Sequence, residues 1–193
     1  IDILAEPLET NEDVSNLLDN LIADPLTKII FMSAALVDFD GSVGTEKSGK
    51  HAPRLQSRGT NYPTISLYPA QKLLPKIRAK RKDIFLVGFK TTTGATEQEQ
   101  YIAGLNLLKE SSCNLVLAND VVTRLNMVIT PEESKYHVTT NRDEALQGLL
   151  DMTLLRSNLT FTQSTVVDGQ PVLWDSDLIY PSLRAVVTWC IHH

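Results

Sequence analysis

The stretch 83–122 constrains the fold more than any other part of the chain, because it contains a strand, a loop, a helix and a second strand in succession. The apolar run 84–88 lies between charged residues and Thr/Gly, which is typical of a strand buried on both faces. Thr96 and Glu99 have the spacing of a capping box, and apolar residues follow at helical intervals. The apolar run 115–118 predicts the second strand. Two such strands pair in parallel through a right-handed crossover, so their carboxyl ends and the start of the helix meet at one edge of the sheet, where ligands bind in open parallel sheets.

Further elements can be placed around this unit from their apolar spacing, caps and turns. Pro75 interrupts one helical pattern, and we expect that helix to begin there. An Asp-Gly turn at 168–169 predicts a hairpin. The expected elements are a strand at 1–4, a helix capped by Thr10 and Asp13 with its apolar stripe at 14–22, strands at 28–32 and 64–67, a helix within 69–82, edge strands at 127–130 and 136–138, a helix capped by Asn141, strands at 161–167 and 172–174, and a terminal helix at 183–191.

This order of elements predicts an α/β fold, namely a Rossmann-like three-layer fold with a mainly parallel sheet and an antiparallel edge hairpin. We expect two parts: a Rossmann-like nucleotide-binding domain at 1–157, and a hairpin-plus-helix appendage at 158–193. The segment 40–62 is rich in glycine and cations and lacks apolar periodicity, so it is expected to be a mobile functional loop.

Composition excludes several classes of function. The net charge of −5 argues against a protein that coats nucleic acid, and no apolar run reaches the roughly 18 residues that span a bilayer. Two cysteines provide neither a disulfide framework nor a thiolate metal cage, which favours a cytoplasmic location. The four histidines show no metal-ligand spacing, so no protein-built metal site is expected.

Polar residues follow each of the strands expected to meet at the ligand-binding edge. The loop 88–95 places hydroxyls, a cation and backbone amides before a helix start, which suits a phosphate but equally suits a polar connector. Asp38 and Asn119 end strands, where they could contact a ligand or begin a turn. Lys109, near the end of its helix, is either a solvated lysine or a functional one.

Several motifs resemble those of phosphopantothenate–cysteine ligases, also called phosphopantothenoylcysteine synthetases. This family forms the synthetase domain of the bifunctional coenzyme A biosynthesis flavoprotein. The resemblance covers roughly residues 1–150 and depends on MSAALVDF at 32–39, the basic stretch after it, LVGF at 86–89 and LANDV at 117–121.

The resemblance implies roles for particular residues. Nucleotide-binding positions would be Ala35, Asp38, Phe39, Phe89 and Lys90, while catalytic positions would be Arg54, Lys109 and Asn119. Arg54 corresponds to a lysine on a flap over the active site in the family, and a planar guanidinium differs from an ammonium in geometry. Lys109 would contact a phosphate.

The implied reaction has two steps and occurs in the cytoplasm. The carboxylate of 4'-phosphopantothenate attacks CTP, or ATP, to give an acyl nucleotidylate, and the amine of cysteine then displaces the nucleotide. The resemblance also implies Mg²⁺ as cofactor and a homodimer. The family's glycine-rich front segment, with an Asn that contacts the intermediate, has no counterpart in this sequence, so we expect it to be truncated, disordered or absent.

Two other interpretations remain open. The chain could be a non-catalytic nucleotide-binding or regulatory relative, or a scaffold whose residues 158–193 serve assembly. Pyrophosphate release that requires phosphopantothenate would distinguish the ligase from both.

Overall fold

The computed structural model describes residues 8–43, 46–47, 64–164, 166–167 and 170–171. The expectations for residues 1–4, 54, 172–174 and 183–191 lie outside the described residues. Within the described ranges, every helix is too short or too polar to traverse a lipid bilayer.

A five-stranded mixed sheet forms the centre of the molecule, in the order β1-β5-β6-β7-β8. β1, β5 and β6 are parallel to one another, and β7 and β8 continue the sheet in antiparallel fashion. β5 continues through Thr92, so the loop expected from residue 90 begins later than the sequence predicts. The strands are β1 (Ile29–Met32), β5 (Phe85–Thr92), β6 (Leu115–Asp120), β7 (Asn126–Ile129) and β8 (Lys135–Thr139).

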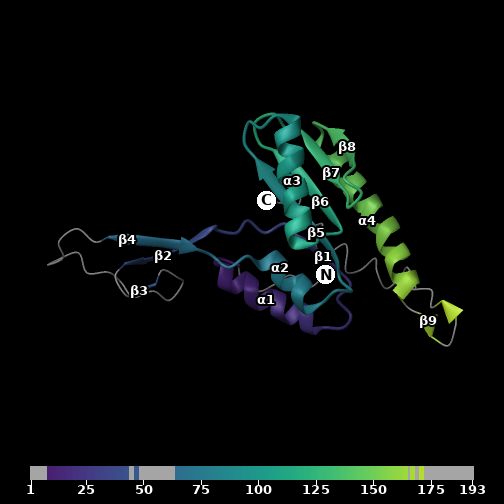
Figure 1. Cartoon of the computed structure of the whole chain (residues 1–193), viewed down its shortest axis with the longest axis horizontal. Helices are drawn as coiled ribbons and strands as arrows, with labels where there is room; N and C mark the ends of the chain where they lie inside the picture. The colour runs from purple at the N-terminus through teal and green to yellow at the C-terminus, as the bar shows by residue number, and fades with distance from the viewer. Residues whose placement is uncertain (1–7, 44–45, 48–63, 165, 168–169, 172–193) are drawn as a thin grey trace.

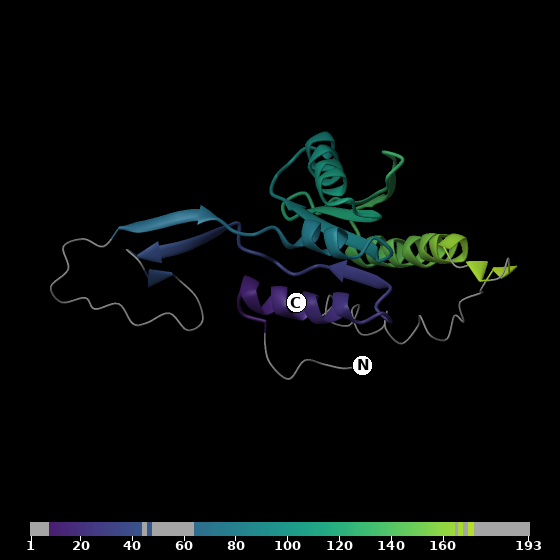
Figure 2. The same cartoon turned by 60° about the horizontal axis from the view of Figure 1, so that its bottom comes forward.

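Helices cover both faces of this sheet (Figures 1 and 2). α1 (Asn11–Ala23), α2 (Leu73–Lys80) and α3 (Glu97–Ser111) contribute to one buried apolar cluster, and α4 (Arg142–Ser164) contributes to another. The alternation of side chains along the strands supplies both clusters, since residues two apart point to the same face. The predicted α/β fold, a Rossmann-like three-layer arrangement, is confirmed.

The sequence predicts the first residue of a helix correctly where a side chain caps that helix. Both expected capping boxes form, at Thr10 with Asp13 and at Thr96 with Glu99. The expectation that the second helix begins at Pro75 is wrong, because α2 begins at Leu73. Proline is tolerated there because the first N–H groups of a helix have no intrahelical partner.

A second, three-stranded sheet extends away from the helices and the central sheet (Figures 1 and 2). It consists of β2 (Phe39–Val43), β3 (Glu46–Lys47) and β4 (Ile65–Pro69), and β2 pairs with β4 in antiparallel fashion. We call β2 and β4 the arm. The expectation of an irregular segment from residue 40 is therefore wrong for 40–43, which pair with β4 more than twenty residues away, and for 46–47, which pair with the end of β2.

α4 continues to Ser164, so the strand expected at 161–167 is wrong for its first four residues. Threonine and aromatic residues favour strands only weakly, and a helix already begun can override that preference. The hairpin itself is confirmed, since β9 (Val166–Val167) pairs with β10 (Gln170–Pro171). The division of the chain at 157/158 remains a prediction, and α4 is continuous across it.

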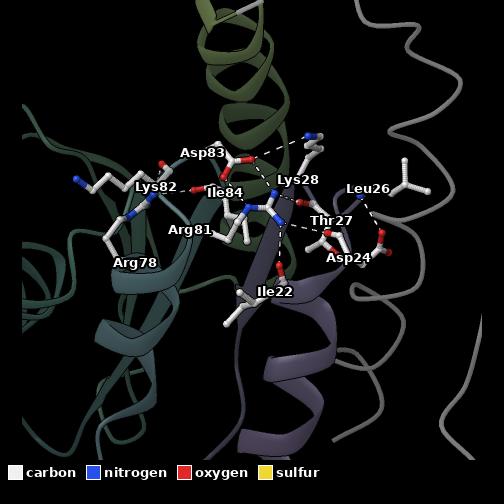
Figure 3. Close-up of polar contacts among 10 residues, drawn as sticks. All are labelled: Ile22, Asp24, Leu26, Thr27, Lys28, Arg78, Arg81, Lys82, Asp83 and Ile84. Atoms are coloured by element: carbon white, nitrogen blue, oxygen red, sulfur yellow. Dashed lines mark hydrogen bonds and ion pairs between the residues drawn. The ribbon is translucent and has the colours of Figure 1, made fainter.

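Arg81, the residue directly after α2, ties the connection between α2 and β5 to the end of α1 (Figure 3). Its guanidinium donates to the carbonyl oxygens of Ile22 at 2.9 Å, Asp24 at 3.2 Å and Thr27 at 3.2 Å. It also forms two hydrogen bonds to the carboxylate of Asp83, at 2.6 and 2.7 Å. A cation is favourable at this end of α1, where the last carbonyl groups carry negative partial charge.

Candidate functional site

The carboxyl ends of β1, β5 and β6 lie together at one edge of the central sheet, which we call the rim. Met32 is level with Gly88, and Thr92 is level with Asp120. β1 therefore ends first, while β5 and β6 extend past it. The prediction that three strand ends, distant in sequence, open on one edge is confirmed.

The segment that follows β1 is held by α1. The side chain of Asn11 donates to the carbonyl oxygen of Val37 at 3.0 Å and accepts from its N–H at 3.2 Å. The carbonyl oxygen of Asp38 accepts from the N–H of Ala70 at 2.9 Å. These bonds place Asp38 between the rim and the arm, and they leave Ala35 exposed.

Asp38 lies among lysine side chains. Lys72, at the start of α2, forms an ion pair with its carboxylate, and both side chains are about 70% exposed. The hydrogen bond from Lys72 is the main cause that lowers the pKa of Asp38; the charge of Lys72 and, more weakly, that of Lys90 add to it. Lys90 therefore acts on the pKa of Asp38 through its charge, whereas Lys72 also contacts the carboxylate directly. Lys72 was missed in the sequence because it belongs to no motif and follows a strand, β4, that is not part of the central sheet.

The pleat of the sheet separates the other predicted residues. Phe89 is partly buried in the apolar cluster on the α4 face, and the hydroxyl of Thr91 donates to Asn119 Oδ1 at 3.2 Å. Phe89, Thr91 and Asn119 therefore share the α4 face, whereas Lys90 points to the opposite face. The predicted nucleotide contacts Phe89 and Lys90, although adjacent in sequence, lie on different faces of the rim.

Arg142 is a further rim residue that the sequence did not indicate. It donates to Asn126 Oδ1 at 3.1 Å, and Asn126 is paired with Asn119 across the strands. The amide group of Asn126 is oriented by its donation to the carbonyl oxygens of Arg124 and Thr139, at 2.7 and 3.3 Å. A possible signal was the position of Arg142 in the first turn of a helix, where a cation is unfavourable without another partner.

The carboxylate of Asp120 occupies the space in front of α3. It accepts hydrogen bonds from five donors: the N–H groups of Gly94 at 3.1 Å, Ala95 at 2.9 Å, Val122 at 2.9 Å and Thr123 at 2.8 Å, and the hydroxyl of Thr92 at 2.8 Å. Burial by itself would raise the pKa of Asp120, but these bonds outweigh it and lower the pKa well below its usual range.

This arrangement decides between the two interpretations of the loop 88–95. The amides of Gly94 and Ala95, which could have held a phosphate, already bind a carboxylate from the same chain. The polar-connector interpretation therefore holds for these two groups. Thr96 and Glu99 then cap the next turn of α3.

Lys109 lies far from the rim. It is twelve residues beyond the start of α3, which corresponds to about 18 Å along the helix. Its ammonium group forms a 2.6 Å ion pair with Glu133, and both side chains are about half exposed. Within one copy of the chain, the structure does not bring Lys109 together with the other predicted residues.

The last two predicted positions are Phe39 and Arg54. Phe39 begins the arm next to Asp38 and is 57% exposed. Arg54 lies outside the described residues, so its predicted position over the site stays a prediction.

Among the described residues, no three His, Cys, Asp or Glu side chains gather in a way that could hold a metal ion. Of the two rim carboxylates, Asp120 is engaged by five donors, and Asp38 is exposed. Mg²⁺ commonly binds through substrate phosphates with one or two protein carboxylates, so the rim fits a metal that arrives with a nucleotide better than a resident one.

The comparisons with known proteins agree with the family resemblance. No protein-family model matches the chain. The bifunctional coenzyme A biosynthesis protein CoaBC of Thermococcus kodakarensis is 24% identical over 112 residues, which are 58% of this chain and 26% of that protein. The chain therefore spans about a quarter of the length of this curated relative.

Solved structures share the fold at low sequence identity. A DNA/pantothenate metabolism flavoprotein from Streptococcus pneumoniae aligns with a TM-score of 0.58 at 15% identity, over 79% of this chain and 70% of that one. A Cab2 mutant in complex with phosphopantothenate-cysteine aligns with a TM-score of 0.62 at 18% identity, over 83% of this chain and 54% of that one. The C-terminal domain of a CoaBC protein gives 0.52 at 15% identity, over 77% and 64%. The predicted similarity to this family is confirmed.

Proposed function

We propose that the chain is the synthetase part of a phosphopantothenate–cysteine ligase and acts in coenzyme A biosynthesis. The observation that carries the proposal is the convergence of three strand ends on one rim, where Asp38 forms an ion pair with Lys72 and lies within the electrostatic influence of Lys90. Ligands bind at this edge of open parallel sheets. One structure with the same fold is described as a complex with phosphopantothenate-cysteine.

The proposed reaction joins a carboxylate to an amine at the expense of a nucleoside triphosphate, CTP or ATP. An oxygen of the phosphopantothenate carboxylate attacks the α-phosphorus, and pyrophosphate leaves. The amine of cysteine then attacks the acyl carbon, loses a proton, and displaces the nucleoside monophosphate. Negative charge develops on the transferred groups in both steps, so cations placed in advance at the rim stabilise the transition states.

The residues divide this work between the two faces of the rim. Lys72 and Lys90 provide positive charge beside Asp38, and Arg54 adds charge from the segment after β2. Mg²⁺, when bound with the nucleotide, supplies neutralisation of the phosphates, and Asp38 is the exposed rim carboxylate that would contact it. On the α4 face, Asn119 offers an amide to the substrate, next to the aromatic ring of Phe89.

The test is pyrophosphate release by the full-length protein with CTP or ATP, in the presence and absence of phosphopantothenate. The ligase predicts release that requires phosphopantothenate, and then amide formation that requires cysteine. The same assay with Asp38→Ala links the chemistry to the rim. If neither nucleotide yields pyrophosphate in the complete mixture, the ligase proposal is wrong.

A non-catalytic nucleotide-binding relative is the second candidate. The Gly94 and Ala95 amides are engaged with Asp120, and this weighs more against catalysis than against binding, because the ligase must also stabilise the charge that develops in the transition state. Calorimetry would support it if CTP or ATP binds in the presence of Mg²⁺ while no turnover occurs.

The homodimer implied by the family resemblance is part of the proposal. Its other partners are the small-molecule substrates: a nucleoside triphosphate, phosphopantothenate and cysteine.

A further inference from the structure

Arg142 is the first residue of α4, and Asn126 on β7 holds its side chain at the rim. Asn126 is only 3% exposed, and its side-chain oxygen accepts from Arg142 at 3.1 Å. Its N–H2 group donates to two carbonyl oxygens, those of Arg124 and Thr139. A buried amide that is bonded in this way cannot turn freely, so Asn126 fixes the direction of the guanidinium. Arg142 itself is exposed.

Asn119 lies next to this pair. It is directly opposite Asn126 in the ladder between β6 and β7, so the two side chains share a face and their Cβ atoms are about 5 Å apart. The side-chain oxygen of Asn119 accepts from the hydroxyl of Thr91 on β5, which directs its N–H2 group away from β5. An amide donor and a guanidinium therefore meet on the α4 face of the rim.

The backbone amides at the start of α4 are already bonded within the chain. The side-chain oxygen of Asn141 accepts from the N–H groups of Asp143 at 3.0 Å and Glu144 at 3.3 Å. The carboxylate of Glu144 accepts from the hydroxyl of Thr139 at 3.0 Å, which turns it toward β8. An anion at this end of α4 must therefore be bound by the side chain of Arg142, and the positive end of the helix dipole favours it further.

We propose that Arg142 binds the phosphate of the acid substrate, 4'-phosphopantothenate, with the amide of Asn119 beside it. The inference rests on the proposed function and adds to it a residue that selects the substrate. A guanidinium matches the geometry of a phosphate and can donate two parallel hydrogen bonds to it. The phosphate of this acid does not react, so the contact contributes to binding and selection rather than to the chemical steps.

The length of the acid suits the width of the rim. β5, which carries Lys90, and β7, which carries Asn126, are separated by β6 and hence by about 10 Å. The carboxylate and the phosphate of the acid lie at opposite ends of a chain as long as roughly three residues, which spans about 10 Å when extended. The acid can therefore cross the end of β6, over Asn119, with its carboxylate beside the lysines that face the nucleotide and its phosphate at Arg142.

Two measurements on the full chain test the inference. In calorimetry, Arg142→Gln should weaken the binding of phosphopantothenate more than tenfold and leave the binding of pantothenate, which lacks the phosphate, unchanged. Arg142→Lys should weaken it less, because an ammonium keeps the charge but not the planar fork. In pyrophosphate release, Arg142→Gln should raise the KM for phosphopantothenate more than tenfold with little change in kcat, because a contact remote from the reacting carboxylate holds substrate and transition state equally.

Arg156→Gln is the matched control. It removes the same charge from the same helix, but fourteen residues further on, about 21 Å from Arg142, where Arg156 pairs with Glu132. Binding and KM should stay at their wild-type values. The inference is overturned if Arg142→Gln binds phosphopantothenate as the wild type does, or if it weakens pantothenate to the same extent. A wild-type chain that binds no phosphopantothenate refutes the proposed function itself, and the inference with it.

Discussion

Replacing Arg81 with alanine should destabilise the protein by about 3 kcal/mol. The guanidinium bonds three carbonyl oxygens at the end of α1 and in the connection to β1, and its side chain is only 20% exposed. We assign ~1 kcal/mol to each bond, below the usual 1.5–3 for a bond to a charged group, because water can replace part of each interaction. The ion pair with Asp83 adds little, since that carboxylate is 51% exposed.

The assay is urea unfolding followed by circular dichroism, with an unchanged m-value as evidence that only the stability has changed. A loss of about 3 kcal/mol lowers the melting temperature of a chain of this length by roughly 6–12 °C. Arg81→Lys should lose roughly two-thirds as much, because an ammonium keeps the charge but cannot reach three carbonyl groups at once. Asp83→Ala should cost less than about 1 kcal/mol. If Asp83→Ala is as damaging as Arg81→Ala, the ion pair dominates and this account of Arg81 is wrong.

Three other predictions concern the rim and the core. Asp38→Ala and Arg54→Ala should each lower turnover more than tenfold with little change in melting temperature, and unchanged kinetics in both would remove these residues from the site. The pKa of Asp120 is lowered in the folded state, so its stabilising contribution is complete above the unfolded pKa of ~3.9 and is lost as the pH falls further. Asp120→Asn should therefore have a lower melting temperature at pH 7, and the melting temperature of this variant should fall less steeply in acid than that of the wild type. Burial raises the pKa of the Cys113 thiol to about 12. In a Cys190→Ser variant this thiol should therefore react with a disulfide reagent at pH 8 only after denaturation. The free energy of unfolding should fall as the pH rises above ~8.5, because the thiol then ionises in the unfolded chain but not in the folded one.

The fold of the central domain could be predicted because its signals are local. The capping boxes at Thr10 and Thr96 place two helices, and the buried strands β5 and β6 are continuous apolar runs. The crossover rule then brings their ends to one edge without any long-range information. The rim follows from these facts alone.

The contacts at the rim could not be predicted, since they depend on which side chains meet across the sheet. The arm forms between residues 39–43 and 65–69, and nothing in either segment alone names its partner. Lys72 reaches Asp38 from the start of a helix on a different part of the chain. Lys109 has the right residue type and family position, yet the length of α3 carries it away from the rim.

Because Asp120 accepts hydrogen bonds from two amides of the loop before α3, the rim must bind the phosphates of a nucleotide with other groups. Two anions cannot accept from the same amides, so the helix start that often binds a phosphate is not open to one while Gly94 and Ala95 donate to Asp120. The phosphates must then be met by side-chain cations. Lys72 and Lys90 together balance the two rim carboxylates, Asp38 and Asp120, so these four side chains carry no net charge (two positive charges and two negative). Cationic side chains, unlike backbone amides, lose rotamer entropy when they are ordered on a ligand. The ligase therefore needs additional positive charge delivered from elsewhere in the chain, such as Arg54, when the nucleotide binds. A relative that only binds nucleotide needs less positive charge, because it does not have to stabilise the charge that develops in a transition state.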